Sequence, residues 1–125
     1  MRLIIAGSRE KKDKEYVLSS ITSLMQGMQV SEVVSGGCRG VDQFGEEWAQ
    51  ERGIPVRRFL PDWEKHGKAA GPIRNREMAE YGDYLIAFWD GQSKGTRSMI
   101  NEAKKNCLSI HVVTRDGSKQ FFHPY

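Results

Sequence analysis

Residues 33–42 read VVSGGCRGVD, and this stretch decides the fold that the sequence predicts. Two β-branched residues end an apolar run, three glycines follow within five positions, and an amphipathic pattern then begins. This order predicts a strand, a tight turn and the start of a helix. Glycines at 36, 37 and 40 allow positive φ and a close approach of a ligand to the main chain. Free N–H groups at a helix start favour an anion such as phosphate, and Arg39 adds a guanidinium beside them.

The glycine-rich stretch alone does not decide between two interpretations. A short glycine-rich signature is a weak motif, and a plain turn between strand and helix explains it equally well. Cys38 lies in the same turn, where it is either a nucleophile or a small loop residue; the sequence offers no base nearby, which favours the second interpretation. The other segments of the chain must therefore contribute to any ligand site.

The composition indicates one soluble globular domain over residues 1–125, with 38% hydrophobic and 28% charged residues. The net charge of +3 permits a phosphate-bearing ligand but does not require nucleic acid. No apolar run approaches the roughly 20 residues of a membrane-spanning helix. The two cysteines have no metal or redox spacing and the three histidines are scattered. We therefore expect a cytoplasmic protein with reduced thiols, no metal and no other cofactor.

Apolar runs alternate with amphipathic patterns along the whole chain. Strands are expected over residues 2–6, 30–34, 54–60, 84–89 and 108–113, and residues 119–125 are compatible with a short extra strand. Four helical patterns lie between the five main strands. This alternation predicts right-handed βαβ units and a Rossmann-like three-layer αβα sandwich, with a mostly parallel five-stranded sheet.

In such a fold, the loops after the first, second and fourth strands meet at the carboxyl edge of the sheet. Each of these loops contains glycine together with hydroxyl or charged side chains. Three anion-friendly loops at one edge favour a ligand site over plain turns. The candidate ligand-binding residues of these loops are Gly7, Ser8, Arg9, Ser35, Gly36, Gly37, Arg39, Gly40, Asp90, Gly91, Ser93, Gly95 and Thr96.

Residues 61–70 are polar and charged, and the sequence predicts an irregular segment there. The segment is either a solvated loop or a lid over the anion site, because the stretch after Trp63 is locally basic. Trp63 itself either stacks on a base, as aromatic side chains do in nucleic-acid-binding proteins, or pins the loop to the core.

Four short motifs in this order resemble the SLOG superfamily: GSR at 7–9, GGCRGVD at 36–42, GPIRNREM at 71–78 and GQSKGT at 91–96. This Rossmann-like group includes the DNA-processing protein DprA and the cytokinin-activating LOG enzymes. Within it, the chain looks most like the small stand-alone YspA-type branch of bacteria and phages. The resemblance covers residues 2–113 and implies a site for a nucleotide or nucleotide-derived ligand, in which the glycines at 36, 37 and 40 hold phosphate or ribose.

The resemblance to the LOG enzymes is incomplete at their catalytic positions. Arg74 and Met78 match the Arg-Lys-x-x-Met helix of those enzymes, whose arginine is catalytic, but Asn75 replaces the lysine. Gly95-Thr96 matches the Gly-Thr of their Gly-Gly-x-Gly-Thr-x-x-Glu signature, but Met99 stands where the catalytic glutamate is expected. Methionine can neither stabilise a developing positive charge nor act as a base.

Three functions are compatible with these residues. The first is a module that binds a nucleotide-like ligand, including Arg74 and Asn75 in the site, as a sensor or sequestering protein. The second is an N-glycosidic hydrolase of nucleoside monophosphates, with Arg74 on phosphate or ribose and Asp42, Asp90 or Glu102 as the carboxylate. The third, single-stranded DNA binding, is less favoured because the net charge is small. A carboxylate in the pocket beside Arg74 would favour the hydrolase, whereas donors and apolar walls alone would favour binding. Because relatives in the superfamily are often dimers, the resemblance also implies that this chain can form a homo-oligomer.

Overall fold

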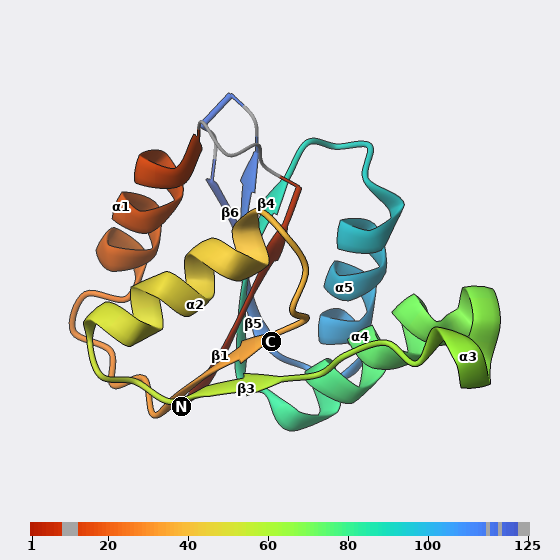
Figure 1. Ribbon diagram of the computed structural model, residues 1–125. Coiled ribbons are helices and arrows are strands. Elements are labelled where there is room, and N and C mark those ends of the chain that lie inside the picture. Colours follow the sequence, from red (N-terminus) through yellow and green to blue (C-terminus); the bar gives the residue numbers. More distant parts are fainter. Residues whose placement is uncertain (9–12, 115, 118, 123–125) are drawn as a thin grey trace.

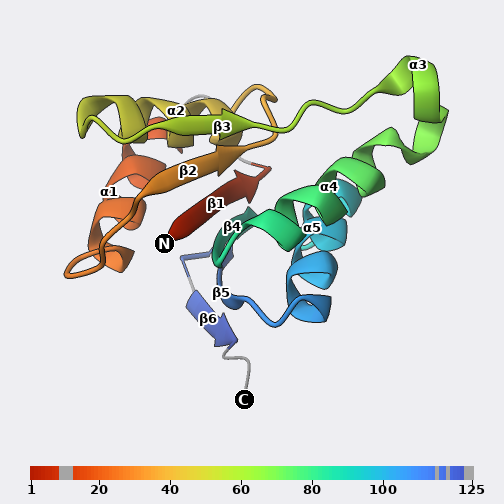
Figure 2. The same ribbon diagram turned by 90° about the horizontal axis from the view of Figure 1, so that it is seen from below.

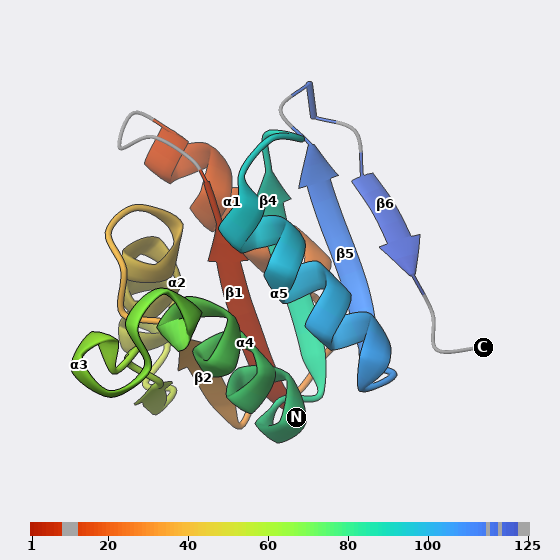
Figure 3. The ribbon, with the colours of Figure 1, turned by 90° about the vertical axis from the view of Figure 1, so that its right-hand side faces the viewer.

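The computed structural model describes residues 1–8, 13–114, 116–117 and 119–122, and they form a three-layer αβα sandwich (Figure 1). The sheet has the strand order β3-β2-β1-β4-β5-β6. Its strands are β1 (Arg2–Gly7), β2 (Glu32–Ser35), β3 (Val56–Arg58), β4 (Tyr84–Trp89), β5 (Ser109–Thr114) and β6 (Lys119–Phe122). The first five strands are parallel, and β6 pairs with β5 in the antiparallel direction (Figure 3). The Rossmann-like fold and the extra carboxyl-terminal strand are thus confirmed.

The helices divide between the two faces of the sheet. Helices α1 (Lys14–Leu24) and α2 (Val41–Glu51) cover one face, whereas α4 (Ala70–Tyr81) and α5 (Lys94–Lys105) cover the other. Among the described residues, no helix is both long and apolar enough to cross a membrane.

The alternation of side chains along β1 explains how one strand serves both layers. Leu3 and Ile5 are buried in the core beneath α1 and α2, whereas Ile4 and Ala6 belong to the core beneath α4 and α5. A parallel strand covered on both faces needs a continuous apolar run, which is what residues 3–6 provide.

Two expectations about residues 54–70 are wrong. The third strand is only Val56–Arg58 rather than residues 54–60. Residues 61–70 are mostly helical rather than irregular, because they contain the short helix α3 (Trp63–His66) and the 3-10 turn η2 (Gly67–Ala69). The Asp62 side chain accepts a hydrogen bond from the Lys65 N–H (3.1 Å) and thereby caps α3. As Figure 2 shows, α3 projects away from the rest of the molecule.

The chain runs outward from β1 to β3 on one side and returns to β4 on the other side of β1. The strand order therefore reverses between β1 and β4, and in open α/β sheets ligands bind at such a reversal, beyond the carboxyl ends of the strands.

Candidate functional site

A cavity of about 150 Å³, here called the small cavity, lies at the carboxyl ends of β1 and β2 and is closed by α4 and α5. The carboxyl end of β1, the loops after β2 and β4, and the helices α2, α4 and α5 contribute to it. Its lining residues are Ala6, Gly7, Gly36, Cys38, Asp42, Arg74, Asn75, Met78, Ser93, Gly95, Thr96 and Met99. The carboxyl end of β1 therefore meets the loops after β2 and β4, at the sheet edge where their positions in the sequence place them.

Gly36 lies where two charged side chains approach the main chain. Arg74 Nη1 donates a hydrogen bond to the Gly36 carbonyl (2.8 Å), and Arg74 Nε donates to Asn75 Oδ1 (3.0 Å). A Cβ added at Gly36 would lie 2.5 Å from Arg74 Nη1 and 2.8 Å from Asp42 Oδ2. Glycine at position 36 thus allows the guanidinium and the carboxyl group to flank the same point of the loop.

Asp42 is the buried carboxyl group of the small cavity, with 8% of its surface exposed. It lies in the first turn of α2 and accepts a hydrogen bond from the Cys38 N–H (3.1 Å). Burial raises the pKa of Asp42 from 3.8 to about 6, although the Cys38 N–H and the Arg74 guanidinium act in the opposite direction. A carboxyl group with a raised pKa in a cavity beside an arginine is suited to acid–base chemistry near neutral pH.

Two amides of the glycine-rich loop already have acceptors within the protein. The Gly37 N–H donates to Ser35 Oγ (3.0 Å), and the Cys38 N–H donates to Asp42. The sequence predicts a loop whose main chain cradles an anion. In the structure, these two N–H groups instead shape the loop, and Arg74 is the cation that lines the small cavity.

Asn75 joins the two helices that close the small cavity. Its Nδ2 atom donates to the Gly95 carbonyl (3.3 Å) and to Ser98 Oγ (3.2 Å). Only 6% of its surface is exposed, so this amide holds the start of α5 against α4. At the same position, the LOG pattern would place a lysine.

The loop after β4 is organised by its own side chains. Asp90 Oδ1 accepts hydrogen bonds from the N–H groups of Gln92 (2.8 Å) and Ser93 (2.7 Å), and these bonds lower the pKa of Asp90. Ser93 Oγ in turn accepts from the Thr96 N–H (3.3 Å) and caps α5. Ser8 Oγ accepts from the Asp90 N–H (3.4 Å) and so ties the first loop to this one.

Several candidates from the sequence do not line the small cavity. The loops after β1 and β4 contain Ser8, Asp90 and Gly91, and a hydrogen bond between Ser8 and Asp90 joins these loops. Gly40 precedes α2 with φ of 82°. Ser35 lies beneath the glycine-rich loop, where its Oγ atom accepts from the Gly37 N–H. Glu102 pairs with Lys105 (3.4 Å) on α5, and Trp63 is 59% exposed on α3. Gly37 and Arg39 line a different cavity, described below. Arg9 lies outside the described residues.

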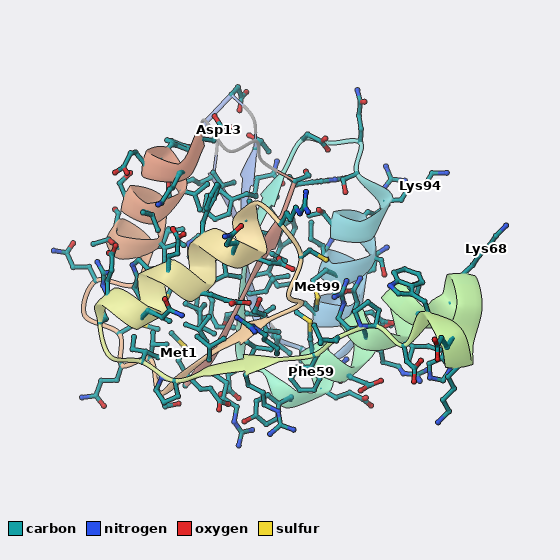
Figure 4. The ribbon with its side chains drawn as sticks, viewed as in Figure 1. Met1, Asp13, Phe59, Lys68, Lys94 and Met99 are labelled. Carbon is teal, nitrogen blue, oxygen red and sulfur yellow. The ribbon has the colours of Figure 1, made fainter. Side chains whose placement is uncertain are left out.

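Met99 is the buried residue that takes the position of the LOG glutamate. It lines the small cavity from α5 with 1% of its surface exposed, and Figure 4 shows it facing the interior of the molecule. In the part of the chain that the structure describes, no group of three or more His, Cys, Asp or Glu side chains could hold a metal ion.

Comparison with known proteins supports the resemblance that the motifs indicate. The family model of the YspA, cpYpsA-related SLOG family matches residues 1–66. This chain belongs to the SLOG family. The gene 61 protein of Mycobacterium phage D29 is 40% identical to this SLOG protein over 116 residues, covering 87% of this chain and 93% of that protein. No solved structure matches the chain significantly.

Sequence reasoning missed one buried ionic network of this SLOG protein. Glu46 of α2 is 7% exposed and accepts hydrogen bonds from Ser35 Oγ (2.7 Å) and Arg58 Nε (3.0 Å). Burial alone would raise the pKa of Glu46, but the hydrogen bonds from Arg58 and Ser35 outweigh burial and lower it. Since Ser35 also accepts from Gly37, this network fixes the glycine-rich loop from below. The signal for this network in the sequence was a glutamate that stands between the apolar residues of α2.

Replacing Arg58 with alanine should destabilise this SLOG protein at pH 7, because the buried carboxylate of Glu46 loses its charged partner. The effect is modest because the Arg58 side chain is 58% exposed. Urea denaturation measures it. Since the folded-state pKa of Glu46 is lowered from 4.5, its stabilisation is present above that pH and is lost as the pH falls through the folded-state value. The difference in the free energy of unfolding between wild type and variant should therefore become smaller as the pH falls below 4.5. An equal difference at pH 7 and pH 3 would contradict this role for Arg58.

Proposed function

We propose that this SLOG protein binds a nucleotide or nucleotide-derived ligand, with a phosphate or ribose group of the ligand in the small cavity. The observation that carries the proposal is the position of Arg74, which lines a cavity at the reversal of strand order together with the end of β1 and the loops after β2 and β4. Membership of the SLOG family indicates a nucleotide-related binding or modifying role.

The hydrogen bonds of Arg74 support an anionic or hydroxyl-rich partner. Nη1 and Nε bond to the protein, whereas among the described residues Nη2 donates no hydrogen bond. A guanidinium has five N–H donors and no acceptor, so Nη2 offers its donors to oxygen atoms of a ligand. The volume of about 150 Å³ suits a phosphate or a ribose rather than a whole nucleotide, since pockets for drug-sized ligands are roughly 300 Å³ or larger.

A second candidate function, hydrolysis of an N-glycosidic bond, is favoured by the position of Asp42. Its carboxyl group lines the small cavity beside Arg74 and could supply the charge that Met99 lacks. In this reaction water adds across the bond between the anomeric carbon and the base: the hydroxyl group joins the sugar, and the proton goes to the base. Asp42 would act as the base towards water or stabilise positive charge on the sugar.

One experiment tests both functions. The protein is incubated with AMP, GMP, CMP and UMP, and mass spectrometry follows the retained nucleotide and the released base. Retention of an intact nucleotide supports the binding function. Release of base and ribose 5-phosphate by the wild type, but not by an Asp42→Asn variant, supports the hydrolase. Neither retention nor release of any of the four nucleotides would contradict both.

A further inference from the structure

A second and larger cavity of about 500 Å³ lies on the other side of the glycine-rich loop, and we call it the large cavity. One face of α2 forms one wall, since residues at positions i, i+3, i+4 and i+7 of a helix share a face. The segment that runs from β3 to Leu60 contributes Arg58 and Leu60 to the lining. The residues of α2 that line it are Gln43, Glu46, Glu47 and Gln50.

The large cavity is adjacent to the small cavity across a single loop. Gly36 lines the small cavity, Gly37 lines the large cavity, and Cys38 lines both. Consecutive Cα atoms are about 3.8 Å apart, so only a few ångströms of main chain separate the two spaces. A ligand with one small group and one larger group could cross the loop at Cys38 and occupy both.

The two cavities differ in size in the way that the parts of a nucleotide differ. The small cavity has room for one phosphate or ribose, whereas the large cavity falls within the roughly 300–1,000 Å³ of small-molecule sites. The larger space therefore has room for a heterocyclic base.

The charges in the large cavity are largely compensated within the protein. Glu46 is paired with Arg58, and Glu47 is paired with Lys14 (2.9 Å). Each of these carboxylates thus already has a cationic partner, which leaves it little capacity to bind a further cation. Besides these pairs, the lining contains the amides of Gln43 and Gln50, the side chain of Leu60 and the guanidinium of Arg39.

The remaining side chains of the large cavity offer what a nucleobase needs. The amides of Gln43 and Gln50 each provide two donors and an acceptor for the edge of a heterocycle. The exposed side chain of Leu60 is apolar, and the Arg39 guanidinium is a planar group of the kind that stacks on bases.

We infer that the large cavity holds the base of a nucleotide whose ribose or phosphate lies in the small cavity. This inference rests on the proposed function, because it needs the sugar–phosphate part of the ligand beside Arg74. It assigns Gln43 and Gln50 to recognition of the base and Arg74 to recognition of the part common to all nucleotides.

Isothermal titration calorimetry with AMP, GMP, CMP, UMP and ribose 5-phosphate tests the inference. The wild type should bind at least one of the four nucleotides tenfold or more tightly than ribose 5-phosphate. The double variant Gln43→Leu, Gln50→Leu keeps the side-chain size but removes both amides. It should bind that nucleotide about tenfold more weakly and bind ribose 5-phosphate unchanged. The matched control is Gln120→Leu on the exposed surface of β6, which should leave both affinities unchanged.

The outcomes separate this inference from the proposed function. If the double variant binds the nucleotide as the wild type does, or if ribose 5-phosphate binds as tightly as every nucleotide, the base lies outside the large cavity and the inference fails while the proposed function stands. If none of the five compounds binds the wild type, the proposed function fails and the inference fails with it. Circular dichroism of each variant confirms that altered affinity does not come from unfolding.

Discussion

An Arg74→Ala variant should bind nucleoside monophosphates between tenfold and a hundredfold more weakly than the wild type, a loss of about 1.5–3 kcal/mol. The guanidinium lines the small cavity and its Nη2 atom is available to a ligand, so alanine removes a charge-assisted hydrogen bond. Alanine also removes the hydrogen bond that Nη1 donates to the Gly36 carbonyl and so loosens the loop. Calorimetric titration of both proteins with the nucleotide that the wild type binds best gives the ratio of dissociation constants.

Arg76 provides the matched control for this prediction. It lies two residues further along α4, is exposed, and does not line either cavity. Arg76→Ala removes the same charge from the same helix and should change the affinity less than threefold. Equal losses in the two variants would indicate a general electrostatic effect instead of a contact with Arg74, and no loss in Arg74→Ala would remove this residue from the site.

An Asp42→Asn variant should be more stable than the wild type at pH 8, by about 3 kcal/mol. A rise of the pKa from 3.8 in the unfolded chain to about 6 in the folded protein means that the folded state binds this proton more tightly. Stability from this group is therefore fully present below pH 3.8 and is lost as the pH rises through 6. Asparagine carries no charge, so its burial does not reduce stability at high pH. Its Oδ1 atom can still accept a hydrogen bond from the Cys38 N–H. Urea denaturation between pH 4 and pH 8 measures the difference, which should grow with pH.

Glu46 is the internal control, because it is a buried carboxyl group of the same helix with the opposite pKa shift. Glu46→Gln should destabilise the protein at pH 7, whereas Asp42→Asn should stabilise it. If both substitutions changed stability in the same direction at pH 7, the two carboxyl groups would not have opposite pKa shifts, and the raised pKa of Asp42 would be contradicted. A stabilised Asp42→Asn protein that no longer releases base would be a direct trade of stability against function.

The layers of this fold could be read from the sequence because each central strand is a short apolar run. Residues 3–6 must be buried on both faces, which only a parallel sheet between two helical layers provides. The convergence of the loops after β1, β2 and β4 followed from the handedness of the crossovers rather than from any one motif. Helix α3 was not predicted, because four residues have no measurable periodicity and its formation depends on the Asp62 cap.

The direction of individual side chains could not be predicted. Asp42 follows the glycine-rich loop and Asp90 precedes Gly91, yet Asp42 lines the small cavity and Asp90 caps its own loop. The difference arises from which N–H groups lie within reach of each carboxyl group after folding. Likewise, the pairing of Glu46 with Arg58 joins residues 12 positions apart in α2 and β3, so no local pattern reveals it.

The hydrogen bond from Arg74 to Gly36 joins two parts of the chain that are 38 residues apart. Residues 1–66, which match the family model, contain the glycine-rich loop and Asp42, while α4 and α5 supply the opposite wall. Neither part alone lines the whole of the small cavity. If the proposed function holds, a fragment that ends near residue 66 should bind no nucleotide by itself. Binding should return when the complementary fragment is added, and such a pair of fragments would be the basis of a two-piece biosensor.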